Sequence, residues 1–168
     1  LTHEYFSAVL DSFKVEAEKR GYDITFINHN ISGRSMTYLE HCHYRSVDGV
    51  VIACVNFYDP QVVELVNSDV PVVTIDHVFN NRMAVLSDNV AGLKALVKQA
   101  WACGHRRIAF IHGEKTSVTE NRIAGFYQAC EELGLEIPEE YVRDGVYHDV
   151  ERCAEETRAL LALPQRPT

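Results

Sequence analysis

Polar side chains that could bind a ligand follow three apolar runs of this sequence. Asn56 follows the run 48–54, Asp76 and His77 follow 71–75, and the segment 112–117 follows 108–111. If these runs are strands of one parallel sheet, such positions form its binding edge, because ligands bind beyond the carboxyl ends of the strands. Asp76 is the sharpest candidate, as a carboxylate placed directly after PVVTI. Aspartate is also a common turn residue, so its position alone leaves both interpretations open.

Metal binding and catalysis find little support among the other polar residues. On a helix, His41 and His43 of the segment HCHY would point about 200° apart, so they cannot share one ion. Asp76 and His77 would need a serine nucleophile, and no G-x-S-x-G elbow is present. The sequence also lacks G-x-G-x-x-G and Walker motifs. We therefore predict no metal site, no nucleotide cofactor and no enzymatic activity.

Apolar residues recur alternately at helical and at strand spacing along the chain. The spacing predicts helices over 5–17, 35–45, 60–66, 89–103, 119–133 and 150–161, and strands over 23–28, 48–54, 71–75 and 108–112, with a short one in EYVRDG. Glycines are expected to end three of the helices, and the pattern Ser117-x-x-Glu120 predicts a capping box. Alternation of this kind predicts an α/β fold with helices on both faces of parallel sheets.

Composition narrows the classes of partner. The chain has 168 residues, 46% of them hydrophobic, and a formal net charge of −8, which argues against this region itself gripping nucleic acid. No apolar run approaches the length of a membrane span. The five cysteines are odd in number and scattered along the chain. We expect buried thiols in a reducing cytoplasm rather than disulfides.

Several motifs resemble the effector-binding region of the LacI/GalR family of bacterial transcription regulators. The similar segments, which run nearly from end to end, are EYFSAVLDSFKVEAEKRGYDI, VDGVVI, DNVAG, GHRRIAFIHG, NRIAGFYQACEELGL and ALLALPQRPT. The resemblance implies two Rossmann-like lobes with parallel sheets, of the periplasmic-binding-protein-like type I. Residues 1–87 would form the N-terminal lobe without its first strand, and 88–168 the front part of an incomplete C-terminal lobe. The helix-turn-helix DNA-binding domain would lie outside this chain.

The resemblance also implies a function and a set of partners. The chain would bind a small-molecule effector, a sugar or a related metabolite, in the interlobe cleft. Binding would allosterically control a homodimer that contacts operator DNA through the absent domain, in the cytoplasm and without a membrane partner. The alternative is a periplasmic sugar-binding protein of a transport system, whose fold is similar.

Four residues match ligand-contacting positions of the family. Tyr5 and Phe6 would stack on a ring of the ligand, although Phe6 also fits the apolar stripe of its helix, and Tyr5 is expected to be the more exposed. Asp76 would accept hydrogen bonds where Arg122 donates them, since a guanidinium offers five N–H donors in a fixed fork. Arg122 could otherwise be a solvated helix residue. Thr116 and Val118 lie at positions that vary with the effector.

Overall fold

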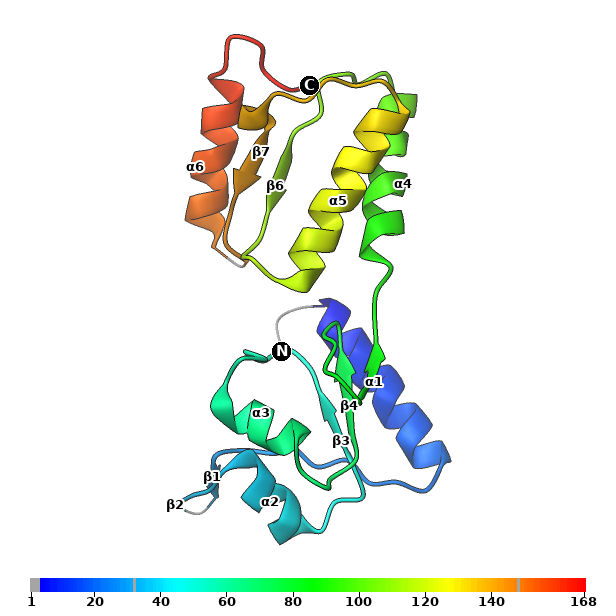
Figure 1. Ribbon diagram of the computed structural model, residues 1–168, viewed down its shortest axis with the longest axis vertical. Helices are drawn as coiled ribbons and strands as arrows, with labels where there is room; N and C mark the ends of the chain where they lie inside the picture. The colour runs from blue at the N-terminus through cyan, green and yellow to red at the C-terminus, as the bar shows by residue number, and fades with distance from the viewer. Residues whose placement is uncertain (1–3, 32, 148) are drawn as a thin grey trace. The chain divides into compact units, whose positions relative to one another are not determined.

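The computed structural model describes residues 4–31, 33–147 and 149–168 (Figure 1). In chain order its elements are α1 (Glu4–Lys19), β1 (Asn30–Ile31), β2 (Arg34–Ser35), α2 (Tyr38–Arg45), β3 (Val50–Ile52), α3 (Pro60–Val66), β4 (Val72–Ile75), β5 (Met83–Val85), α4 (Asn89–Ala102), β6 (Phe110–His112), α5 (Ser117–Glu132), a 3-10 turn (Glu139–Tyr141), β7 (Val142–Asp144) and α6 (Val150–Leu161). Helices and strands alternate, which confirms the predicted α/β class.

The strands form parallel ladders in two places. In a three-stranded sheet of order β3-β4-β5, β4 pairs with β5 in parallel, with Val73 opposite Met83. Farther along the chain, β6 pairs with β7 in parallel, with Phe110 opposite Val142. Within the described residues, β7 is the one strand bonded to β6, so the other edge of β6 is open. A small antiparallel hairpin, β1-β2, completes the set.

The chain divides into two compact units. The first comprises residues 1–50 and 56–71, and the second comprises 51–55 and 72–168. These two units are defined by which residues contact one another. The sequence predicts a division into two lobes near residue 87, and that division stays a prediction.

In the first unit, helices α2 and α3 pack against each other. Thr37 caps α2 with a capping box that includes Glu40. Asp59 caps α3, where Pro60 takes the first helical position. The imidazole of His41 is buried and contacts the backbone of Asn28, whose N–H donates to Nδ1 over 2.9 Å. A buried, hydrogen-bonded histidine of this kind acts as part of the core.

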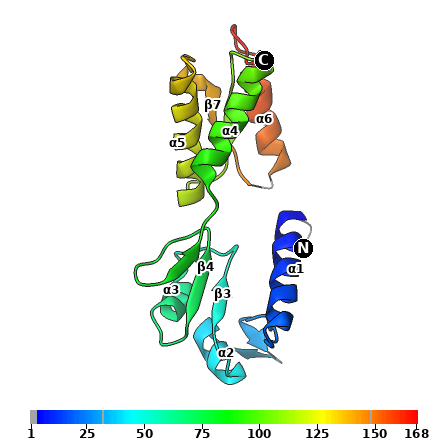
Figure 2. The same cartoon turned by 90° about the vertical axis from the view of Figure 1, so that its right-hand side faces the viewer.

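The second unit is built around helices α4 and α5, which lie side by side (Figures 1 and 2). Figure 1 shows β6 and β7 between these helices and α6. The apolar core of the second unit is centred on Val97, Phe126, Ala129 and Cys130, with partly buried residues from β6 and β7 against them. On the surface, Glu132 of α5 pairs with Lys94 and Lys98 of α4. Hydrogen bonds from these lysines lower the pKa of Glu132 to about 2.

Several sequence predictions about local structure are wrong. Helix α2 begins at Tyr38 instead of 35, because Ser35 pairs with Asn30 in the β1-β2 hairpin and Thr37 caps the helix. Residues 23–28 form no strand, and residues 22–26 are exposed, because the described chain places no strand beside them to pair with their backbone groups. Helix α5 begins at Ser117 instead of 119, and its cap is Thr116, whose hydroxyl accepts from the Thr119 N–H. The predicted capping box at Ser117 therefore does not form.

The cysteines agree with the sequence prediction only in part. All five are free, which fits the expectation of thiols rather than disulfides. Cys42 and Cys130 are buried, but Cys54 and Cys103 are exposed, which contradicts the expectation of buried thiols for these two.

None of the helices in the described part of the chain is long and apolar enough to cross a membrane.

Candidate functional site

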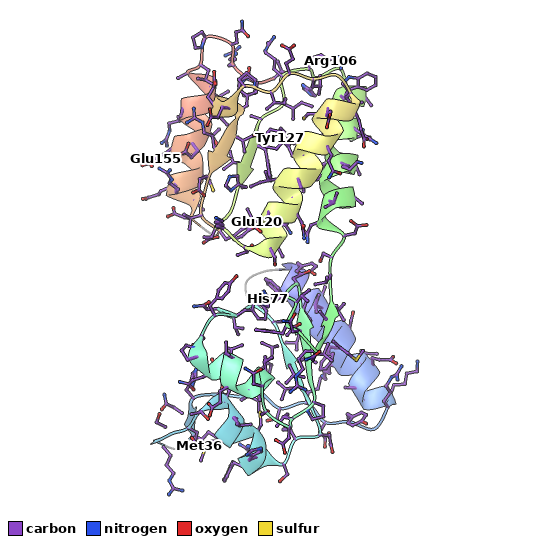
Figure 3. All side chains as sticks on the ribbon, viewed as in Figure 1. Met36, His77, Arg106, Glu120, Tyr127 and Glu155 are labelled. Atoms are coloured by element: carbon purple, nitrogen blue, oxygen red, sulfur yellow. The ribbon has the colours of Figure 1, made fainter. Side chains whose placement is uncertain are left out.

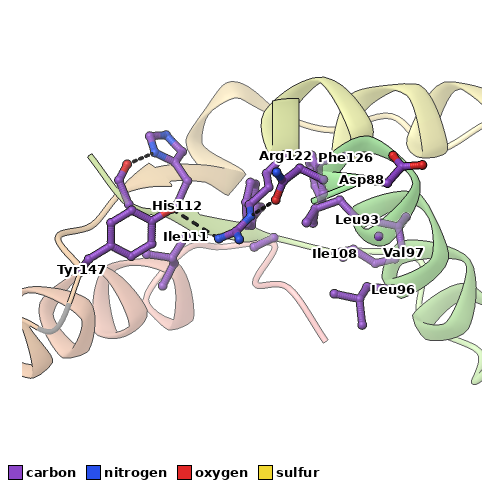
Figure 4. Close-up of a pocket in the computed structure, with 15 residues that line it drawn as sticks. Asp88, Leu93, Leu96, Val97, Ile108, Ile111, His112, Arg122, Phe126 and Tyr147 are labelled. Atoms are coloured by element: carbon purple, nitrogen blue, oxygen red, sulfur yellow. Dashed lines mark hydrogen bonds between the residues drawn. The ribbon is translucent and has the colours of Figure 1, made fainter. Parts of the chain in front are cut away.

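An open cavity of about 680 Å³ lies in the second unit, lined by residues of α4, β6 and the first half of α5 (Figure 4). One part of its wall is apolar, formed by Leu93, Leu96, Val97, Ile108, Phe110, Ile111 and Phe126. The polar groups gather where β6 ends, and they comprise Asp88, Asn89, His112, Arg122 and Tyr147. This is the carboxyl end of a parallel strand, where the fold class predicts a ligand.

Arg122 is the half-buried cation of this cavity. Its Nε donates to Oδ1 of Asn89 over 2.8 Å, and its Nη1 donates to the hydroxyl of Tyr147 over 3.3 Å (Figure 4). In the described part of the chain, no carboxylate forms an ion pair with it. Because a guanidinium has five N–H donors, two bonds leave three donors for other acceptors. The binding role of Arg122, like the solvated-residue alternative, stays a prediction.

The position of Arg122 depends on a close approach of α4 and α5. Gly125 is buried one turn after Arg122, on the same face of α5, and a Cβ placed on it would lie 2.5 Å from the Val90 carbonyl oxygen. The absent side chain lets the two helix backbones nearly touch, which brings Asn89 at the start of α4 within reach of Arg122. The R-x-x-G spacing thus has a local structural reason.

Tyr147 is a site residue that the sequence reasoning missed. Its ring lies directly on Gly113, where a Cβ would be 2.2 Å from the ring. Its backbone N–H donates to Glu114, and its hydroxyl shares a 3.0 Å hydrogen bond with the buried Thr119. These contacts fix a partly exposed aromatic ring beside Arg122. The signal that would have found it is the strand-end rule, because Tyr147 follows β7.

His112 ends β6 and presents a further nitrogen to the cavity. Its Nδ1 lies 2.8 Å from the carbonyl oxygen of Gly113 and 3.8 Å from a carboxylate oxygen of Asp144. The carbonyl can only accept, so the contact at 2.8 Å favours a proton on Nδ1. In the neutral ring, Nε2 is then an acceptor, which complements the donors of Arg122.

Asp76 follows β4 in the left-handed backbone conformation, with φ 60°. Its N–H donates to the Val85 carbonyl over 2.9 Å, and its Oδ1 accepts from the Ser87 N–H over 2.8 Å. These bonds give Asp76 the turn role that the sequence left open. They occupy one carboxylate oxygen, and its ligand-binding role stays a prediction.

Two residues near Asp76, His77 and Cys54, have shifted pKa values. Burial lowers the pKa of His77, which follows it in the chain (Figure 3). Although Cys54 is exposed, partial desolvation by its neighbours raises the pKa of its thiol, and the charge of Asp76 raises it further. Cys54 also has a left-handed backbone, with φ 59°. Two non-glycine residues with positive φ thus lie shortly after β3 and β4, a conformation that aspartate tolerates better than cysteine does.

The remaining predicted residues occupy separate places. Tyr5 and Phe6 lie in the first turns of α1, in the first unit, with their rings edge to face at 5.2 Å. Tyr5 is exposed and Phe6 is half-buried, as expected for the pair. Thr116 caps α5, and Val118 is half-buried behind it. Within the residues that the structure describes, no three histidine, cysteine or acidic side chains are grouped to hold a metal ion.

Comparisons with known proteins agree on one family. The model of periplasmic binding proteins and the sugar-binding domain of the LacI family matches residues 1–168. The HTH-type transcriptional repressor PurR of Haemophilus influenzae (strain PittEE) is 28% identical over 169 residues, which cover 98% of this chain and 50% of the repressor. The chain spans about half the length of the curated relatives it matches.

Solved structures give the same result for the fold. A putative ribose operon repressor from Burkholderia thailandensis superposes with a TM-score of 0.79 at 25% identity, over 99% of this chain and 63% of the repressor. A LacI transcriptional regulator from a Rhodococcus species gives a TM-score of 0.82 at 23% identity, over 100% of this chain and 62% of the regulator. The second likeness, at this identity, concerns the fold alone. The predicted periplasmic-binding-protein-like fold is confirmed.

Proposed function

Because the chain belongs to the family of periplasmic binding proteins and LacI-family sugar-binding domains, we propose that it is the effector-sensing region of a bacterial transcriptional regulator. Its relatives are transcriptional repressors, and such proteins are not enzymes. The effector would be a small metabolite, a sugar first of all. By changing the relative stability of two conformations, it would control how a DNA-binding domain elsewhere in the protein contacts its operator.

The observation that supports this proposal best is the guanidinium of Arg122. It has donors to spare, no carboxylate partner in the described chain, and a fixed orientation from Asn89 and Tyr147. A sugar presents hydroxyl and ring oxygens to such a fork, and a purine presents carbonyl or ring-nitrogen acceptors. Tyr147 adds an aromatic face next to these donors, as ligand sites with few fixed polar groups require.

The other site residues complete the proposal. Asp76 would accept from ligand hydroxyls through the oxygen that Ser87 does not use. Tyr5 and Phe6 would stack on the ring of the effector. We infer a homodimer in the cytoplasm for the whole regulator. The five free thiols favour a reducing compartment over the periplasm and so speak against a periplasmic sugar-binding protein.

The test begins with native mass spectrometry of the purified chain, which identifies any small molecule that it retains. Titration calorimetry then compares D-ribose and adenine as probes, together with the retained molecule. Arg122→Ala and Asp76→Ala should each weaken binding roughly ten- to a hundredfold, as expected for the loss of a charged hydrogen-bond partner. Gln128→Ala, on the exposed surface of α5, is the matched control. Unchanged affinity in both site variants would contradict the site assignment.

A further inference from the structure

We propose that Asn89 is a positioning residue that couples Arg122 to Asp76 through Ser87. The inference deepens the proposed function, because it rests on Arg122 and Asp76 being the two polar contacts of the effector. Asn89 belongs to α4 and Arg122 to α5, while Asp76 ends β4. One series of hydrogen bonds joins all of them.

The series has three steps. The Arg122 Nε–H donates to Oδ1 of Asn89 over 2.8 Å (Figure 4). The side-chain amide of Asn89 then donates from Nδ2 to the Ser87 carbonyl over 3.1 Å, and its backbone N–H donates to the same oxygen over 2.8 Å. On the other side of Ser87, its own N–H donates to Oδ1 of Asp76 over 2.8 Å. A shift of the guanidinium is thus passed to the chain segment that holds the Asp76 carboxylate.

Asn89 is free for this role because another residue caps the helix. The carboxylate of Asp88 accepts from the Ala91 N–H over 3.0 Å, which is the usual cap contact of α4. The side chain of Asn89 therefore points to Arg122 and Ser87 instead. A carboxamide has an acceptor for the guanidinium and a donor for the carbonyl at once. Aspartate at this position would keep the first contact and lose the second.

The Asp76 end of the series is poised to change. Asp76 has a left-handed backbone, which aspartate adopts more readily than most residues with a side chain, and its bonds to Val85 and Ser87 hold it there. An effector that donates to the other Asp76 oxygen would draw negative charge from Oδ1 and so weaken the bond from the Ser87 N–H. An effector that takes donors from Arg122 would act on the same residue, Ser87, through the carbonyl that Asn89 bonds. Binding of a ligand at Arg122 would therefore affect Asp76, and binding at Asp76 would affect Arg122, even when no single ligand contacts both residues.

Hydrogen exchange of the Ser87 amide, measured by NMR on the chain without any ligand, tests this coupling. Asp76→Ala removes the acceptor of the Ser87 N–H directly, so it should give the largest rise in the Ser87 exchange rate. Arg122→Ala should raise the Ser87 exchange rate roughly two- to tenfold, the loss expected from one weakened hydrogen bond. Arg122→Lys, which keeps the charge and loses the Nε donor, should act in the same direction. Gln128→Ala is the control and should leave Ser87 unchanged.

The decisive comparison is a double-mutant cycle with Asn89→Asp. In that background Arg122 keeps an acceptor and the backbone N–H of residue 89 still donates to Ser87, but the side-chain donor is gone, so Arg122→Ala should change Ser87 exchange by less than about twofold. An equal effect of Arg122→Ala in both backgrounds would overturn the proposal, because the coupling would then bypass the amide. A rise shared by all amides of α4 would also overturn it, since that indicates general loosening.

The outcome is separate from the fate of the proposed function. If Ser87 responds as expected while neither D-ribose, adenine nor a retained molecule binds, the coupling stands and the effector assignment fails. If a probe binds in an Arg122-dependent way while Ser87 exchange ignores Arg122, the coupling fails and the effector assignment stands.

Discussion

Replacing Gly125 by alanine tests the packing on which the geometry of the candidate site depends. Gly125 lies in the middle of α5, where alanine is normally the better helix former by about 1 kcal/mol. An exposed glycine in such a helix should therefore stabilise the protein when it becomes alanine. Gly125 is different, because a Cβ there would be 2.5 Å from the carbonyl oxygen of Val90 and 3.0 Å from its Cα.

The expected magnitude follows from these distances. An ordinary contact begins near 3.4 Å, so the Val90 carbonyl would have to move by about 0.9 Å, the difference between 3.4 and 2.5 Å. Overpacking of this kind costs about 1–3 kcal/mol, and the gain in helix propensity offsets about 1 kcal/mol of it. Gly125→Ala should therefore lower the free energy of unfolding by up to about 2 kcal/mol. The Arg122–Asn89 bond, now 2.8 Å, should lengthen beyond hydrogen-bonding range.

Urea denaturation gives the stability change, and the NMR signal of the Arg122 Nε–H reports the hydrogen bond. Gly92→Ala in α4 is the matched control, because no atom lies within 4 Å of a Cβ placed there. We expect Gly92→Ala to raise stability by about 0.5–1 kcal/mol and to leave the Arg122 signal in place. If Gly125→Ala is stabilised as much as Gly92→Ala, the close approach of α4 and α5 is wrong, and so is the explanation of the R-x-x-G spacing.

Three further predictions concern single contacts. Asp76→Asn should speed the reaction of Cys54 with a thiol reagent at pH 8, because it removes the charge that raises the Cys54 pKa. An unchanged rate would show that the charge of Asp76 does not affect Cys54. Glu132→Gln should destabilise the chain at pH 6 and progressively less from pH 4.5 down to 2, because a carboxyl with a lowered pKa stabilises the fold only while it is ionised; a pH-independent difference in thermal unfolding would refute this. Thr116→Ala should cost about 1 kcal/mol in urea denaturation, whereas Ser117→Ala should change stability by less than about 0.5 kcal/mol, and the reverse order would restore the capping box.

Sequence patterns located the elements whose stability is local. Helix α4 was predicted within one residue, because its cap and its ending glycine act within a single turn. The run 23–28 failed because a strand is stable only with a neighbour, and its own residues cannot reveal whether one is present. For the same reason β5, three residues that pair with β4, left no signal strong enough to predict.

The residues of the candidate site differ in the same way, in whether local sequence or tertiary contacts decide their positions. Arg122 was predicted from the resemblance of its motif to the family, and its role in binding stays a prediction. The structure adds that Gly125 of the same motif lies one turn later on the same face of α5. The role of Asn89 could not be predicted, since nothing local distinguishes a side chain that bonds its own helix from one that bonds a residue 33 positions away. Tyr147 was missed because its place depends on Gly113, and the space over a glycine belongs to whichever chain segment the fold brings there. Residues that match a family motif can therefore be named from the sequence more readily than the residues that orient them, because orientation is decided by tertiary contacts between helices and strand ends. This is also why the coupling through Asn89 follows from the structure and not from the sequence.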